Sequence, residues 1–77
     1  MRKVTLTLNE YNKARKFNEI VSKFISDIDV VRGRYILDAK SFMALLTMDL
    51  SIPIDVILHS DDEKEIKRFE EMMEEFK

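Results

Sequence analysis

Ser41 is the side chain whose type and position most readily suggest chemistry. It stands directly before a short apolar run, Phe42-Met43-Ala44-Leu45-Leu46, and serine at such a place commonly caps the first turn of a helix. A phosphate on its hydroxyl would meet free backbone N–H groups and the positive end of the helix dipole, with Lys40 beside it. The pattern therefore predicts an N-cap, at a position where the helix end would also accommodate a phosphate.

Other reactive groups are sparse. The only histidine is His59 at the end of an apolar segment, where we expect a surface side chain. Glu70-Glu71 and Glu74-Glu75 recur four residues apart on an expected helix, a spacing seen in carboxylate metal sites. Without histidines, they indicate a solvated acidic face. The chain has no cysteine, which excludes disulfides, thiolate catalysis and Cys-ligated zinc. We predict no catalytic residue, metal or cofactor.

The apolar side chains after Ser41 are too many for one short helix to bury. Some of these residues should face outward, where an exposed remainder favours a binding surface over ordinary core. Lys40, Phe42, Met43 and Leu46 are the predicted partner-binding residues. Core remains the alternative, since methionine fills gaps in a core as readily as it lines a binding surface.

The elements that would position these residues follow from periodicity. Alternation predicts strands over 3–8, 28–31, 35–39 and 54–59, and spacings of three and four predict helices from Asn9, from Ser41 to about Met48, and from Asp61. Asn9 and Asn12 are both plausible N-caps for the first helix. Gly33 suits the first central position of a type II′ hairpin turn.

Composition bounds the class of protein. Seventy-seven residues with one Gly and one Pro predict a single dense domain over residues 1–77. The basic N-terminal half and acidic C-terminal half, with a net charge of −2, favour a protein partner over nucleic acid. No apolar run approaches the roughly 20 residues of a membrane span, and the N-terminus lacks a secretory signal. We expect no membrane association and a cytoplasmic location.

The element order is βαββαβα. It predicts an α+β fold, an open-faced β-sandwich whose four-stranded antiparallel sheet carries its helices on one face. A ferredoxin-like fold, often RNA-binding, shares much of this order. Its RNA-binding versions need aromatic residues on the middle strands of a basic sheet face, whereas the only strand aromatic is Tyr35, expected to point inward with Leu37.

Two segments resemble the HPr family, the histidine-containing phosphocarriers of the bacterial sugar phosphotransferase system. Ser22-Lys23-Phe24-Ile25-Ser26-Asp27-Ile28 is similar to the family's S-K-[FY]-x-[AS]-D-[IV]. Lys40-Ser41-Phe42-Met43-Ala44-Leu45-Leu46-Thr47-Met48 is similar to K-S-I-M-G-[LV]-[ML]-S-[LA]. The resemblance implies the same open-faced fold, a Ser41 equivalent to a kinase target, and an apolar docking patch at Phe42, Met43 and Leu46.

The segment that matches the family's active-site loop departs from the pattern. The family carries phosphate on the histidine of G-[IL]-H-A-R-P-A, and this chain is about three residues shorter there. A gap in the loop puts Glu10 at the histidine's place. A gap in the helix puts Lys13 there and keeps Arg15 as the phosphate-binding arginine. Asn12 lies in the same segment. Neither alignment supplies an imidazole, so we expect no phosphohistidine.

Three hypotheses follow for the function. The first is a non-enzymatic regulatory or protein-binding module acting through the Ser41 helix, with a phosphotransferase-system enzyme, a Ser kinase or a regulator as partner. The second is a divergent phosphocarrier that takes part in sugar transport. The third is an oligomerisation module, in which Val31, Ile36 and Ile57 form a homo-oligomer contact on the open sheet face.

Overall fold

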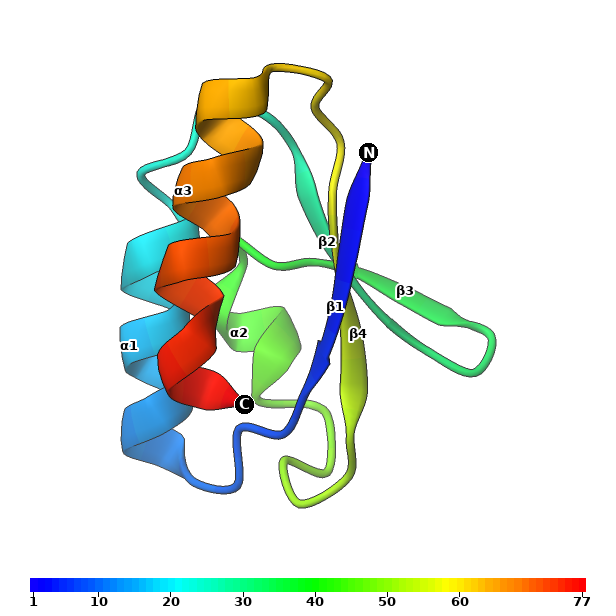
Figure 1. The fold of residues 1–77 in the computed structure, drawn as a ribbon. Helices are drawn as coiled ribbons and strands as arrows, with labels where there is room; N and C mark the ends of the chain where they lie inside the picture. The colour runs from blue at the N-terminus through cyan, green and yellow to red at the C-terminus, as the bar shows by residue number, and fades with distance from the viewer.

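The computed structural model describes residues 1–77 as one antiparallel sheet with helices packed on one side of it (Figure 1). The strands are β1 (Arg2–Leu6), β2 (Ile28–Arg32), β3 (Tyr35–Asp38) and β4 (Ile54–Leu58). The helices are α1 (Tyr11–Val21), α2 (Phe42–Leu45) and α3 (Glu63–Met73), which continues into a 3₁₀ turn, η1 (Glu74–Phe76).

The strand order β1-β4-β2-β3 places β4 and β2 in the centre of the sheet, and every pair is antiparallel. β1 and β3 are the two edge strands. This arrangement confirms the predicted α+β open-faced sandwich. It rejects the ferredoxin-like alternative, because that fold has its first and third strands in the middle.

Strand alternation decides which side of the sheet the helices cover. The covered face takes every second side chain of the two central strands, including Ile28, Val30, Val56 and Leu58, all fully buried. Helix residues spaced by three and four pack against this face, as Ala14, Phe17 and Val21 of α1 show. Every one of the 17 buried residues is apolar. The spacings of three and four that predicted the first helix therefore mark its buried face.

The connection before α1 differs from the prediction. Glu10, not an asparagine, occupies the N-cap position, and its side chain makes no capping hydrogen bond. Asn9 instead adopts a left-handed backbone with φ of 69°, and its N–H donates to the Leu50 carbonyl at 2.7 Å. Asparagine tolerates this conformation better than most residues. Asn9 thus serves the turn, and Asn12 lies within the helix.

The hairpin between β2 and β3 follows the expected turn chemistry. Arg32 pairs with Tyr35, which leaves Gly33 and Arg34 as a two-residue loop. Gly33 has a φ of 59°, while Arg34 is not among the residues with positive φ, as a type II′ turn requires. Tyr35 lies on the covered face with Leu37, as predicted, yet it remains 64% exposed. The hairpin extends past the end of the helical cover (Figure 1).

Helix α2 is shorter than predicted, because it ends at Leu45 and the following residues form turns. None of the helices combines the length and apolar character that a membrane span requires.

Candidate protein-binding site

Ser41 caps helix α2. Its Oγ accepts a hydrogen bond from the Ala44 backbone N–H at 3.4 Å, the i to i+3 geometry of an N-cap. At the other end of the same turn, Thr47 Oγ1 donates to the Ala44 carbonyl at 2.6 Å. Side chains thus close both ends of a helix of only four residues. The Ser41 side chain is partly exposed, and the capping interpretation is confirmed. Its phosphorylation stays a prediction.

Lys40 has a structural role in this region. Its Nζ donates to the Phe24 carbonyl at 2.7 Å, just beyond the C-terminal end of α1. Its backbone N–H donates to Asp38 Oδ1 at 2.9 Å. A cation near the carbonyls at a helix C-terminus is favoured by the helix dipole. The Lys40 ammonium therefore ties the Ser41 segment to α1, a task that the sequence did not reveal.

The apolar side chains of α2 divide into a buried and an exposed set. Leu45 is fully buried, whereas Met43 is 75% exposed and Leu46 is 38% exposed. Phe42 is half-buried against the core, and its ring meets Tyr11 of α1 edge to face at 5.5 Å. The prediction that the short helix could not bury all of its apolar side chains is confirmed. We call Tyr11, Phe42, Met43 and Leu46 the α1–α2 surface.

Tyr11 was missed by sequence reasoning, although it is 54% exposed and joins the two helices at this surface. The available signal was an aromatic residue at the first position of a helix, outside the apolar stripe. Only the packing of α1 against α2 shows which residue it meets.

The predicted active-site-equivalent residues lie beside this surface at the start of α1. Glu10 is the N-cap residue, while Asn12, Lys13 and Arg15 lie inside the helix and are exposed. Their position agrees with the helix predicted from Asn9, and their equivalence to the family's active-site residues stays a prediction. The other three are helical because the apolar positions Ala14 and Phe17 must stay in register with the core. The first turn of α1 carries no acidic side chain.

His59 lies at the opposite end of the sheet. It follows β4, whose Leu58 pairs with Arg2 at the start of β1, whereas α1 begins after the far end of β1. Its Nε2 is 2.8 Å from Asp29 Oδ2. The histidine is exposed, as predicted. Because the two residues lie at opposite ends of β1 and β4, His59 is separated from Glu10 by the length of a strand.

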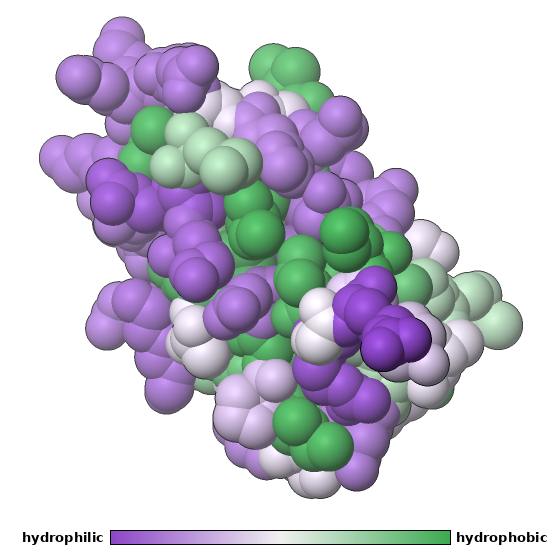
Figure 2. All heavy atoms as spheres, turned by 90° about the vertical axis from the view of Figure 1, so that its right-hand side faces the viewer, coloured by the Kyte–Doolittle hydropathy of each residue, from purple (hydrophilic) through white to green (hydrophobic).

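The open face of the sheet is more polar than predicted. Val31, Ile36 and Ile57 do lie on it, yet Asp29 and Asp55 alternate with them along the same strands. Thr5 Oγ1 donates to Asp55 Oδ1 at 2.6 Å. Figure 2 shows this side of the molecule, with apolar patches broken up by hydrophilic side chains. Self-association through the open face stays a prediction.

Two carboxyl groups have a lowered pKa, and both are held by serines. The Ser26 hydroxyl donates to Glu65 and is the main cause of the lowered pKa of that carboxyl, with Ser60 adding to it. Ser51 likewise lowers the pKa of Asp49 through its hydroxyl, at 2.6 Å from Oδ1, and its backbone N–H. These hydrogen bonds hold two loops in place, the one after α1 that contains Ser26 and the one before β4 that contains Asp49 and Ser51. Nowhere do three or more His, Asp or Glu side chains converge as metal ligands would.

The fold and the surface together define a small α+β domain of the open-faced type with an exposed apolar patch beside the start of α1. A comparison with solved structures places this fold. The crystal structure described as HPr-C-His from Thermoanaerobacter tengcongensis aligns with a TM-score of 0.75 and 26% sequence identity, covering 96% of this chain and 92% of that one. The fold is therefore HPr-like. No protein-family model matches the chain, and no curated protein sequence does.

Proposed function

We propose that this chain is a non-catalytic protein-binding module of HPr-like fold, which recognises its partner through the α1–α2 surface. The observation that carries the proposal is the division within α2, where Leu45 anchors the helix while Met43 and Leu46 are left exposed. Exposed apolar side chains grouped on one surface are a common mark of interaction sites. The resemblance around Ser41 supports a partner from the phosphotransferase system or its regulation.

The residues beside the surface favour binding over phosphate transfer. Glu10, Lys13 and Arg15 occupy the start of α1, and none of them has an imidazole. The sole imidazole, His59, lies at the other end of the sheet and is bound to Asp29. A protein phosphocarrier needs a nucleophile that is neutral near pH 7 and close to the docked partner. A divergent phosphocarrier is the alternative that the experiment must exclude.

Ser41 is the proposed point of control on this surface. Its hydroxyl is partly exposed and lies next to Phe42, so a phosphate there would place about two negative charges beside the apolar patch. The phosphoserine would change the electrostatics of docking directly. Its terminal oxygens would also add acceptors at the start of α2, where Oγ now accepts from the Ala44 N–H.

The experiment uses the first enzyme of the phosphotransferase system with phosphoenolpyruvate. We expect the chain to bind this enzyme, measured by calorimetry, without acquiring acid-labile phosphate. Met43→Lys should weaken binding, because it puts a charge on the most exposed side chain of the α1–α2 surface. Ile25→Lys is the matched control, since Ile25 is 94% exposed in the loop after α1.

Equal loss of binding in both variants would overturn the assignment of the surface, as would no loss in either. Phosphate recovered on His59 would overturn the non-catalytic function and favour the phosphocarrier alternative. Ser41→Asp tests the control point separately, because the carboxylate can still cap α2. A change in affinity with an unchanged melting temperature is the expected result.

A further inference from the structure

The outer edge of β3 is unpaired and presents free backbone groups. The two-residue turn makes Arg32 and Tyr35 the hydrogen-bonded closing pair of the hairpin. Because bonded and non-bonded pairs alternate in an antiparallel ladder, Ile36 and Asp38 direct their backbone N–H and C=O away from β2. The Asp38 carbonyl accepts from Ser41 N–H at 3.0 Å, while no turn or side chain uses the Ile36 groups.

This edge lacks several of the features by which proteins prevent strand pairing. It has no proline, lysine or bulge, although β3 is only four residues long and ends in the charged Asp38. β3 reads Tyr-Ile-Leu-Asp and pairs with β2 without interruption, and the hairpin extends clear of the helices (Figure 1). Its Tyr35 and Ile36 are 64% and 67% exposed, one on each face of the sheet. The other edge strand, β1, carries Arg2 and Lys3.

From these observations we propose that two copies of this chain dimerise by antiparallel pairing of their β3 strands, about a two-fold axis at Ile36. The segment Arg34-Tyr35-Ile36-Leu37-Asp38 is complementary to itself in this register. Ile36 lies opposite the partner's Ile36, and their outward N–H and C=O groups bond each other. The result is a continuous eight-stranded sheet.

The charges at the two ends of the segment also match. The register carried one step beyond β3 brings Arg34, the turn residue that precedes the strand, to the partner's Asp38, and by symmetry this contact occurs twice. Neither side chain forms an ion pair within its own chain, and both are exposed. Asp38 accepts a hydrogen bond from the Lys40 N–H through Oδ1 only, which leaves Oδ2 for the guanidinium. Opposite charges directly across an antiparallel pair are stabilising.

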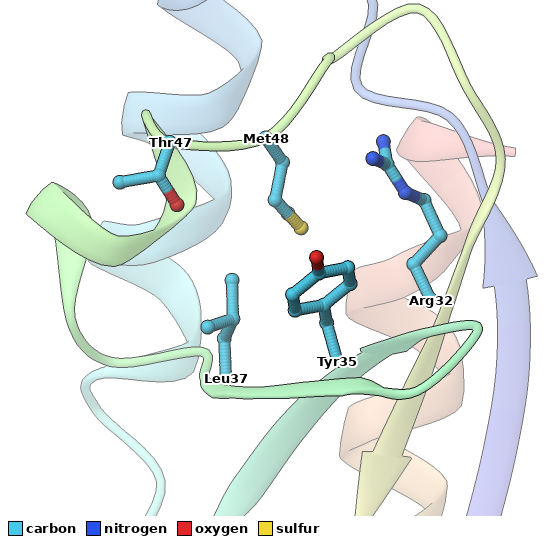
Figure 3. Close-up of a pocket in the computed structure, with 5 residues that line it drawn as sticks. All are labelled: Arg32, Tyr35, Leu37, Thr47 and Met48. Carbon is cyan, nitrogen blue, oxygen red and sulfur yellow. The ribbon is translucent and has the colours of Figure 1, made fainter.

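On the covered face, the same register brings Tyr35 opposite the partner's Leu37. Tyr35 and Leu37 rise from β3 toward Met48 and Thr47, and with Arg32 they line a shallow pocket (Figure 3). Because Tyr35 and Leu37 belong to the edge strand, the side chains of an added strand would lie next to this pocket on the covered face. The pairing thus buries apolar surface on both faces of the joined sheet.

Charge reversal tests the register. Arg34→Asp alone places carboxylates opposite carboxylates, and Asp38→Arg alone places guanidinium groups opposite guanidinium groups. Sedimentation of the wild type should show a dimer fraction that rises with concentration. Each single variant should weaken dimerisation by about tenfold or more, because two attractive pairs become repulsive. An equimolar mixture of the two variants should form heterodimers again, because every opposed pair is then complementary.

Ile36→Pro tests the backbone contact. It removes a donor that faces the free edge and is not used in the ladder with β2, so the fold should tolerate it. This variant should be monomeric, while Ile57→Lys on the open face should still dimerise. A wild type that stays monomeric at millimolar concentration overturns the proposal. So does a dimer that resists both charge reversals, or one that only Ile57→Lys disrupts. None of these outcomes depends on binding through the α1–α2 surface.

Discussion

The covered and uncovered parts of this molecule are built from the same few elements and differ in what their side chains meet. Under the helices, Phe17, Leu45 and Leu58 are fully buried. Outside that cover, residues next to them in sequence or similar in type are exposed, as Leu46 and Tyr35 show. The difference separates the residues that hold the fold from those available for partners. In a chain of 77 residues, both sets come from the same short segments.

The sharpest test of this difference compares two aromatic residues. Phe17→Ala should cost about 3–5 kcal/mol of unfolding free energy, because it opens a cavity in the centre of the core where the ring contacts Phe76 edge to face. Tyr35→Ala should change stability by only about 0.5 kcal/mol, as is usual at the surface. Denaturant unfolding measures both. Similar losses in the two variants would contradict the division.

The same contrast can be tested within α2. Leu45→Ala should destabilise the protein by about 2–5 kcal/mol, since the side chain is fully buried. Leu46→Ala should cost about 1 kcal/mol or less, because much of its surface is already in water. Melting curves of the two neighbouring variants give the comparison directly. A large loss at Leu46 would make this helix ordinary core and remove the α1–α2 surface.

The cap of α2 should have a smaller effect. Ser41→Ala removes the acceptor for the Ala44 N–H, and the expected loss is about 0.5–1 kcal/mol, since the bond is long at 3.4 Å. Ser41→Asp should restore most of it. Thr47→Ala is a useful control, because its hydroxyl bonds the Ala44 carbonyl at the other end of the same turn. No difference between Ser41→Ala and wild type would mean that the cap bond does not hold in solution.

The smallest expected effect is the pH dependence of the Ser26–Glu65 bond. Glu65 has a lowered pKa in the folded state, chiefly through the Ser26 hydroxyl, so its stabilisation is present above the unfolded value of about 4.3. It is lost as the pH falls through the lower folded value. Ser26→Ala should therefore cost less than about 1 kcal/mol at pH 7, and the difference from wild type should shrink below pH 4. A constant difference across this range would contradict the assignment.

Local patterns were enough to predict the elements and the faces they bury. Alternation predicted β1, β2 and β4, and the three- and four-residue spacing of apolar positions such as Ala14, Phe17 and Val21 predicted α1, whose buried face they form. Gly33 placed the hairpin turn, and α3 is capped by Asp62, which accepts from the Lys64 N–H one residue after the predicted start at Asp61. These features depend on residues within a few positions of each other, and that is the range over which periodicity and capping act.

The site depended on contacts between distant segments, which no local pattern contains. Lys40 reaches the Phe24 carbonyl, His59 meets Asp29, and Tyr11 packs on Phe42, each across 16 residues or more. The residues around Ser41 were enough to show that α2 has more apolar side chains than so short a helix can bury. That Leu45 is buried and Met43 exposed depends on where α1 and the sheet lie around the helix, which is a property of the folded molecule. The place of β3 at the free edge is a property of the same kind, since strand order is set by pairing between distant segments.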